Sequence, residues 1–419
     1  MADASPARRL WRVAAFRRFW VGETISFLGN EVTALALPLT AVLMLGAGPT
    51  EMGLLTAAWF LPYIVLGLPA GVWVDRMRRQ RILVGLDLLS AGTVLLVPLA
   101  ASIGLLRIEL LYAVSFVLGS AVVVFMVAYQ SFVPTLVGRA SIAEANTALE
   151  ATSSGTTIAG PGLAGILVQL LGAPFALVVD AASFLISAML VQSIRIEEPP
   201  PMLDAERRPA FEQIREGIAY VIASPALRAL TTGGAIHNFF TRMIDALFVL
   251  FASGELGLDA ASIGLVVAAA GPGALLGSFL SGPARTRLGL GRTIWIAQVG
   301  TGIARLLVPL AIVAGRGIPG ALVLAASLFL LGLVRSVFNV NQLSLRLAMT
   351  PDRMHGRLNA TMRFVMWSVT PVGAIVGGLL ASTALGIQGT LVLAGIGVLA
   401  ATVPFLHPGL RSLARLPGG

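Results

Sequence analysis

Apolar stretches of roughly 20 residues recur along the whole chain, and they constrain its fold more than any other feature. Each matches the hydrocarbon thickness of a bilayer. The chain is 57% hydrophobic and only 12% charged, whereas soluble domains are about 25% charged. The expected spans are residues 20–46, 51–74, 82–104, 108–132, 147–171, 174–195, 226–252, 259–282, 293–315, 319–342, 359–383 and 387–408. We therefore predict an all-α integral membrane protein with twelve transmembrane helices.

Missing residue types exclude several kinds of chemistry. The chain has no cysteine, which excludes disulfides and thiolate sites, and all 29 basic residues are arginine, which excludes a phosphate-binding loop built around lysine. We find no catalytic triad and no metal-binding spacing among the three histidines. We therefore expect no enzyme, no metal or cofactor and no ATP. The net charge of +9 comes from arginines beside apolar spans, so we expect a lipid bilayer rather than nucleic acid as the partner.

The arginines predict the orientation in the membrane. Most lie in loops on one side of the expected spans: Arg8 to Arg18, Arg76 to Arg81, Arg139, Arg207, Arg208, Arg215, Arg285 to Arg292, Arg346, Arg353, Arg357, Arg411 and Arg415. Loops rich in arginine face the cytoplasm. We therefore expect a multi-pass protein of the cell inner (plasma) membrane with both termini in the cytoplasm.

The two halves of the chain repeat one another. The basic loop at residues 71–81 recurs in degraded form at 282–292, and Gly160 and Gly165 align with Gly373 and Gly378 at an offset of 213 residues. Six spans in each half predict parallel repeats. We expect an N-terminal lobe at 1–195, a cytoplasmic linker with an amphipathic helix at 196–225, and a C-terminal lobe at 226–419.

Three sequence features resemble a known superfamily. The loop with Gly71, Asp75, Arg76 and Arg79 resembles the loop 2–3 signature of the major facilitator superfamily, although Gln80 departs from it. The segment containing Gly160, Pro161 and Gly165 resembles its antiporter motif, and residues 16–30 and 180–187 are similar to the enterobactin-exporter and macrolide-efflux branch. The resemblance implies a two-lobed fold, alternating access and export driven by a proton gradient.

Ionisable residues inside the spans are candidates for the transport site, because such groups are costly in lipid unless they have a partner or reach a cavity. They are Glu23, Glu31, Asp87, Glu150, Asp180, Arg242, Asp245, Arg305, Arg335 and Arg363. Asn238, Arg242 and Asp245 share one helical face, on which Arg242 and Asp245 are spaced to pair. The pair is interpreted either as a structural bridge or as a site where protonation of Asp245 frees Arg242 for an anionic or carbonyl group of the substrate.

The first span offers a second polar face. Glu31 beside Asn30 is the preferred protonatable residue, with a structural role as the alternative. Asp87 is interpreted as a local partner of Arg78 and Arg81. Glycines spaced four apart, such as the pair Gly67 and Gly71 and the pair Gly273 and Gly277, predict close helix contacts.

The resemblance also predicts a cytoplasmic gate. In the superfamily the loop aspartate engages the start of the eleventh span, so Asp75 is expected to bond Arg363 there. The repeat maps Arg363 onto Glu150 and places Arg285 and Arg287 in the equivalent loop, which predicts a second pairing with opposite polarity. The alternative is that Glu150 complements its own helix dipole.

The preferred interpretation is a monomeric secondary transporter that exports a small amphipathic molecule by proton antiport. A facilitator or importer on the same fold remains open, as does a membrane sensor without turnover. Acids and arginines in the spans nearly balance, so the sequence favours neither cationic nor anionic substrates.

Overall fold

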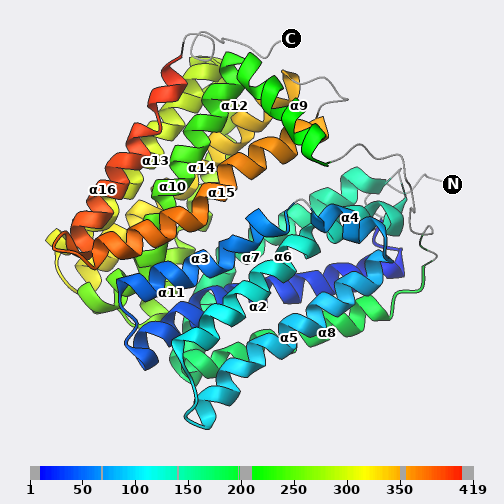
Figure 1. Ribbon diagram of the computed structural model, residues 1–419, viewed down its shortest axis with the longest axis horizontal. Helices are drawn as coiled ribbons and strands as arrows, with labels where there is room; N and C mark the ends of the chain where they lie inside the picture. The colour runs from blue at the N-terminus through cyan, green and yellow to red at the C-terminus, as the bar shows by residue number, and fades with distance from the viewer. Residues whose placement is uncertain are drawn as a thin grey trace. The chain divides into compact units, whose positions relative to one another are not determined.

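The chain is built from long α-helices (Figure 1). A computed structural model describes residues 10–67, 69–138, 141–196, 198, 210–349 and 355–407, and within these ranges it holds helices and connecting turns but no β-strand. In the part of the chain that the structure describes, eleven helices are long and apolar enough to cross a membrane, and the pair α3 and α4, bent by 62°, makes a twelfth when counted as one span. The predicted all-α membrane fold is confirmed.

One compact unit comprises Met1–Leu45 and Leu61–Ala205. Its helices are α2 (Ala14–Leu45), the end of α3 (Pro49–Val65), α4 (Pro69–Asp75), α5 (Arg79–Ser102), α6 (Ile108–Val137), α7 (Ile142–Leu171) and α8 (Ala173–Gln192). Helix α2 packs against α7 and α8, and α5 packs against α6 and α8. Phe16, Phe19 and Phe132 are fully buried in the core of this unit.

The other unit comprises Gly46–Phe60 and Glu206–Gly419. It contains the start of α3, α9 (Ala210–Ala223), α10 (Pro225–Leu250), the π-helical turn η2 (Phe251–Glu255), α11 (Ala260–Ala268), α12 (Ala270–Leu288), α13 (Leu290–Ala314), α14 (Ile318–Ala348), α15 (His355–Ala381), α16 (Gly386–Ala400) and the 3₁₀ turn η4 (Val403–Leu406). The start of α3 is part of this unit because Ala57 packs with Ala246 of α10 and Ala374 of α15.

The same helix pairings occur in both units. The contacts of α2 with α7 and α8 recur as those of α10 with α15 and α16. Those of α5 with α6 and α8 recur as those of α13 with α14 and α16, and the contact of α4 with α6 recurs as that of α12 with α14. The helices follow one another in the same order in each unit. The parallel repeat predicted from the sequence is therefore present in the packing.

Small residues bring α12 and α14 together. A Cβ atom on Gly273 or Gly277 would collide with the backbone carbonyl of Phe329 or Leu333, so only glycine fits at these two positions. A Cβ atom on Gly71 would meet open space. The close helix contact predicted from Gly67 and Gly71 is therefore wrong at Gly71, since spacing alone does not say which way a glycine points.

The helix predicted in the linker is confirmed as α9. Its Val221 is buried in the core of the second unit, and the hydroxyl of Tyr220 donates to the carbonyl oxygen of Met349 at 3.0 Å. Its place on the inner membrane surface stays a prediction.

The orientation of the chain in the membrane also stays a prediction. Several of its arginines lie outside the described residues: Arg8, Arg9, Arg139, Arg207, Arg208, Arg353, Arg411 and Arg415.

Candidate functional site

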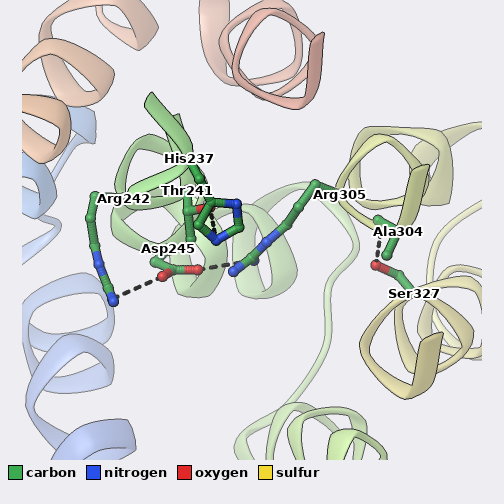
Figure 2. Close-up of polar contacts among 7 residues, drawn as sticks. All are labelled: His237, Thr241, Arg242, Asp245, Ala304, Arg305 and Ser327. Atoms are coloured by element: carbon green, nitrogen blue, oxygen red, sulfur yellow. Dashed lines mark hydrogen bonds and ion pairs between the residues drawn. The ribbon is translucent and has the colours of Figure 1, made fainter. Parts of the chain in front are cut away.

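Asp245 of α10 lies between two arginines (Figure 2). Its Oδ2 is 2.9 Å from Nη1 of Arg242, three residues earlier on the same helix. Its Oδ1 is 2.9 Å from Nη1 of Arg305 on α13. The pairing of Arg242 with Asp245 predicted from their spacing is confirmed, and Arg305 joins it from a helix that the spacing could not indicate.

The arginines outnumber the acid at this site. Arg335 of α14, itself exposed, interacts electrostatically with Arg242, Arg305 and Asp245, so three positive charges share one carboxylate. The side chain of Arg305 is only 7% exposed, while those of Arg242 and Asp245 are 22% and 29% exposed. The Nε atoms of Arg242 and Arg305 are buried and have no hydrogen-bond partner in the described part of the chain. The site therefore holds hydrogen-bond donors that another oxygen could satisfy.

Polar and aromatic groups surround this charge cluster. His237, one turn before Thr241 on α10, has its Nδ1 3.1 Å from Nε2 of Gln298, which is buried on α13. The ring of Phe60 at the end of the first part of α3 lies 4.4 Å from Cζ of Arg242 and 6.0 Å from the ring of Trp367. The charge cluster thus has an aromatic border at Phe60 and Trp367.

Of two further residues predicted for the transport site, one belongs to this charge cluster and the other points away from it. Arg335 belongs to it through its charge. Asn238 instead donates to the carbonyl oxygen of Met366 at 2.7 Å and so ties α10 to α15. A role of Asn238 in substrate binding stays a prediction.

In the first unit, Glu31 is half-buried on α2 and packs against Gly160 of α7. Pro161 and Gly165 follow Gly160 on the buried side of α7, which continues through the proline. Asn30 is also half-buried on α2. The structure therefore brings the acid of the first span to the motif of the fifth, two features that the sequence presents separately.

The residues of the predicted gate sit near the ends of their helices. Gly71 and the half-buried Asp75 lie on α4, exposed Arg76 follows it, and half-buried Arg79 begins α5. Exposed Glu150 lies in the first part of α7, and Arg285 and Arg287 form the last turn of α12. Exposed Arg363 lies in the first part of α15. The two gate pairings stay predictions.

The cap at the start of α5 was not predicted from the sequence. Glu198 accepts hydrogen bonds from the backbone N–H groups of Arg79 and Gln80, at 2.7 and 2.9 Å, and so caps the start of α5. The side-chain amide of Gln80 donates to the carbonyl oxygens of Val191 and Ile194, both at 2.8 Å. Gln80, at which the sequence departs from the loop signature, therefore fastens α5 to the end of α8. The glutamates before the proline run of the linker were the available signal.

The interpretation of Asp87 was wrong. Asp87 is only 2% exposed in the core of the first unit, whereas Arg78 and Arg81 are exposed, and no ion pair joins them within the described residues. Six residues along a helix correspond to a rotation of about 240°, so Arg81 and Asp87 point in different directions. Proximity in sequence misled the assignment.

A membrane fold of repeated helix pairings, with charges held inside its spans, defines a secondary transporter of the major facilitator class rather than an enzyme. The chain belongs to the transmembrane secretion effector family, whose sequence profile matches residues 6–415. It thus falls in the efflux branch of the major facilitator superfamily, as the sequence motifs predicted.

Individual relatives cover almost the whole chain. The chain is 28% identical to the multidrug efflux pump Tap of Mycolicibacterium fortuitum over 92% of its own length and 93% of that protein. It is 25% identical to the enterobactin exporter EntS of Citrobacter koseri over 87% and 85% of the two chains. Its fold matches the crystal structure of a bacterial homologue of the iron transporter ferroportin with a TM-score of 0.73 and 17% identity, covering 94% of this chain and 98% of that one.

Proposed function

We propose that this multi-pass membrane transporter exports a small amphipathic molecule in exchange for protons, and that this molecule carries an anionic or carbonyl oxygen. Family membership and the efflux names of the relatives support export. The energy source would be the proton gradient, with no cofactor, ATP or nucleic acid involved, and the working unit a monomer. Each lobe would move relative to the other to alternate access to the site.

The observation that carries the substrate class is the excess of arginine around Asp245. Both oxygens of Asp245 are already bonded, and two buried Nε atoms lack acceptors among the described residues. Guanidinium groups bind carboxylates and similar oxygens in a planar, bidentate way, and such bonds are strong where water is excluded. Arginines and acids nearly balance inside the expected spans of the whole chain, but around Asp245 in the second unit the arginines dominate. A carboxylate, phenolate or carbonyl oxygen of the substrate would satisfy the free donors.

The aromatic border supports the amphipathic character of the substrate. Phe60 and Trp367 lie beside the charge cluster, and Phe60 already contacts the guanidinium of Arg242. An aromatic or aliphatic body could pack on these rings while a polar group reaches the arginines. A wholly polar ion would use only half of such a site.

The proposed location is the cell inner (plasma) membrane with both termini in the cytoplasm, as the distribution of arginine supports. The chain has no cysteine, so single cysteines can be introduced without a background. Cysteines at exposed Arg76 and exposed Glu109, which lie at opposite ends of the first-unit spans, should be labelled by an impermeant maleimide from opposite sides of the membrane. Labelling of both from one side would contradict this topology.

Transport into inverted membrane vesicles tests the function. An anionic amphipathic dye and a cationic dye of similar size would be compared, with the interior acidified or with the gradient collapsed by a protonophore. We expect gradient-driven accumulation of the anionic dye, reduced in Arg335→Gln. Equilibration that does not respond to the gradient would indicate a facilitator, and preference for the cationic dye would contradict the proposed substrate class.

A further inference from the structure

Proton antiport requires a proton site that disfavours the bound substrate. At Asp245 the linkage has the opposite sign, because protonation would release Arg242 and Arg305 to an anionic substrate oxygen, so proton and substrate would bind together. Asp245 therefore suits substrate binding but not antiport of an anionic substrate. The exchanged proton has to be held elsewhere in the molecule.

Three buried acids lie in the core of the first unit, on helices that pack together. Glu23 of α2 is 1% exposed, Asp87 of α5 is 2% exposed and Asp180 of α8 is 0% exposed. Helix α8 packs against both α2 and α5. Asp87 acts electrostatically on Glu23, and Asp180 acts on Asp87, so the carboxyl groups form a chain.

Most of the hydrogen-bonding capacity of Glu23 and Asp87 is unused. Both oxygens of Glu23 and Oδ2 of Asp87 are buried and lack a hydrogen-bond partner within the described residues. Ser187 of α8 acts on Asp87 as a hydrogen-bond donor. Asp180 is better provided, since Thr33 of α2 donates to its Oδ2 and Ser183 donates to its Oδ1 at 3.0 Å. An ionised carboxylate without donors is very unfavourable in a protein interior, whereas a protonated carboxyl is tolerated.

Among the described residues, the charged groups that act on Glu23 and Asp87 are acids: Asp87 acts on Glu23, and Asp180 acts on Asp87. Tyr129 of α6 is in turn influenced by the charges of Glu23 and of Glu150 on α7. This is the reverse of the second unit, where one acid has three arginines. Ionisation of all three buried carboxyl groups at membrane depth is very unfavourable, so protons must occupy at least some of them.

The arrangement of the three acids fits protons better than a metal ion. Glu23 and Thr33, which bonds Asp180, are ten residues apart on α2, or about 15 Å along its axis. Within the described residues no group of acids or histidines converges as metal ligands would. The three acids are thus spread along the helices instead of gathered around a point.

We propose that Glu23, Asp87 and Asp180 form the proton-carrying site of this transporter, separate from the substrate site around Asp245. The inference rests on the proposed proton antiport. Protons would occupy these carboxyl groups in the substrate-free protein and leave them when substrate binds in the second unit. Glu23 and Asp87 would take up and release them, while the donors to Asp180 hold the end of the chain in place.

The test separates coupling from movement of substrate. Glu23→Gln and Asp87→Asn would be reconstituted in liposomes beside the parent and the control Glu109→Gln, an exposed acid on α6. Two readouts are compared for the anionic dye: accumulation driven by a pH gradient, and exchange of labelled for unlabelled dye without any gradient. One antiported proton gives about tenfold accumulation per pH unit, since 1.36 kcal/mol corresponds to one unit.

We expect accumulation to fall from about tenfold to about onefold in Glu23→Gln and Asp87→Asn, with exchange retained, and no change in Glu109→Gln. Full accumulation in both variants would overturn the inference. If the parent itself ignores the gradient, the proposed antiport fails instead.

A second measurement does not depend on the folding of any variant. Infrared difference spectra of the parent report the carbonyl stretch of protonated carboxyl groups. We expect this band to be present without dye and to weaken when the dye binds. A spectrum without such a band, or one that dye leaves unchanged, would contradict the proton-carrying role.

Discussion

Glu31 of α2 packs onto Gly160 of α7 so closely that a Cβ atom on Gly160 would lie 2.5 Å from Cγ of Glu31. The absence of a side chain at Gly160 is what makes room for the acid. Glu31 is an acid inside the first span, and Gly160 belongs to the segment that resembles the antiporter motif. The contact gives that glycine a physical role, which is to hold the carboxyl group of Glu31 in place.

Gly160→Ala should displace Glu31 and strain α2 against α7. Forcing a methyl group into a packed contact costs roughly 1–3 kcal/mol. We expect a lower unfolding temperature in detergent and several-fold slower transport, the latter because Glu31 no longer points where the native packing sets it.

Gly155→Ala is the matched control on the same helix. Gly155 is exposed and a Cβ atom there would meet open space. Its stability should stay equal or rise by up to about 1 kcal/mol from helix propensity. If the two alanine variants have the same stability and the same transport rate, the contact between Gly160 and Glu31 contributes to neither.

Arg305→Gln should be destabilising. The side chain is 7% exposed and its ion pair with Oδ1 of Asp245 would be lost, while Arg242 stays paired with Asp245. A hydrogen bond to a charged group contributes roughly 1.5–3 kcal/mol, and we expect a loss of that size. Chemical denaturation of the purified protein measures this loss.

The double variant Arg305→Gln with Asp245→Asn separates structure from function. The losses in stability of the two single variants should not add, and the loss in the double variant should fall short of their sum by about 0.5–3 kcal/mol because the two residues are in contact. Binding of the anionic dye should be weak in the double variant because a guanidinium is missing. Dye binding equal to that of the parent would show that the pair is only a structural bridge.

Glu198→Ala should loosen the start of α5. The carboxylate accepts two backbone hydrogen bonds there, and loss of such a cap costs about 0.5–2 kcal/mol. Hydrogen exchange at the amides of Arg79 and Gln80 should quicken. Glu109→Gln, at the exposed start of α6, should leave those amides unchanged, and equal protection in both variants would exclude the capping role.

Stability should carry a pH dependence from Asp259, which lies outside the spans. Its carboxylate caps α11, and the hydrogen bonds from Ser262 lower the pKa of this group below its ordinary value. The contribution is therefore present above the unfolded pKa of about 3.9 and is lost as the pH falls through the lower folded pKa. Asp259→Ala should cost about 1 kcal/mol at neutral pH. Asp259→Asn should keep the cap and lose its pH dependence, which denaturation at two pH values can check.

Much of the fold could be predicted because it depends on local patterns. Apolar stretches locate the helices whatever the tertiary structure, and the spacing of Arg242 and Asp245 requires that they meet on one helix. The repeat of the basic loop at residues 71–81 indicated the duplication that the helix pairings show.

The rest depends on contacts between segments far apart in sequence. Arg305 reaches Asp245 from another helix, and Glu198 reaches the start of α5 across 119 residues. Asp87 was matched to arginines nearby in sequence, although the helix turns it into the core. Similarly, Gly71 resembled Gly273 in spacing, yet only Gly273 faces a neighbouring backbone. In both cases the contacts of the residue depend on which side of its helix it lies, and packing determines that side.

Coupled flux most directly tests whether this transporter exchanges protons for an anionic amphipathic molecule. Liposomes containing the purified protein would be loaded with the anionic dye and a pH indicator, with equal pH on both sides and the membrane potential clamped. Outward flow of dye should drive protons inward and acidify the interior, and a protonophore should abolish that signal. Dye efflux without any proton movement, or with protons leaving alongside the dye, would contradict the account.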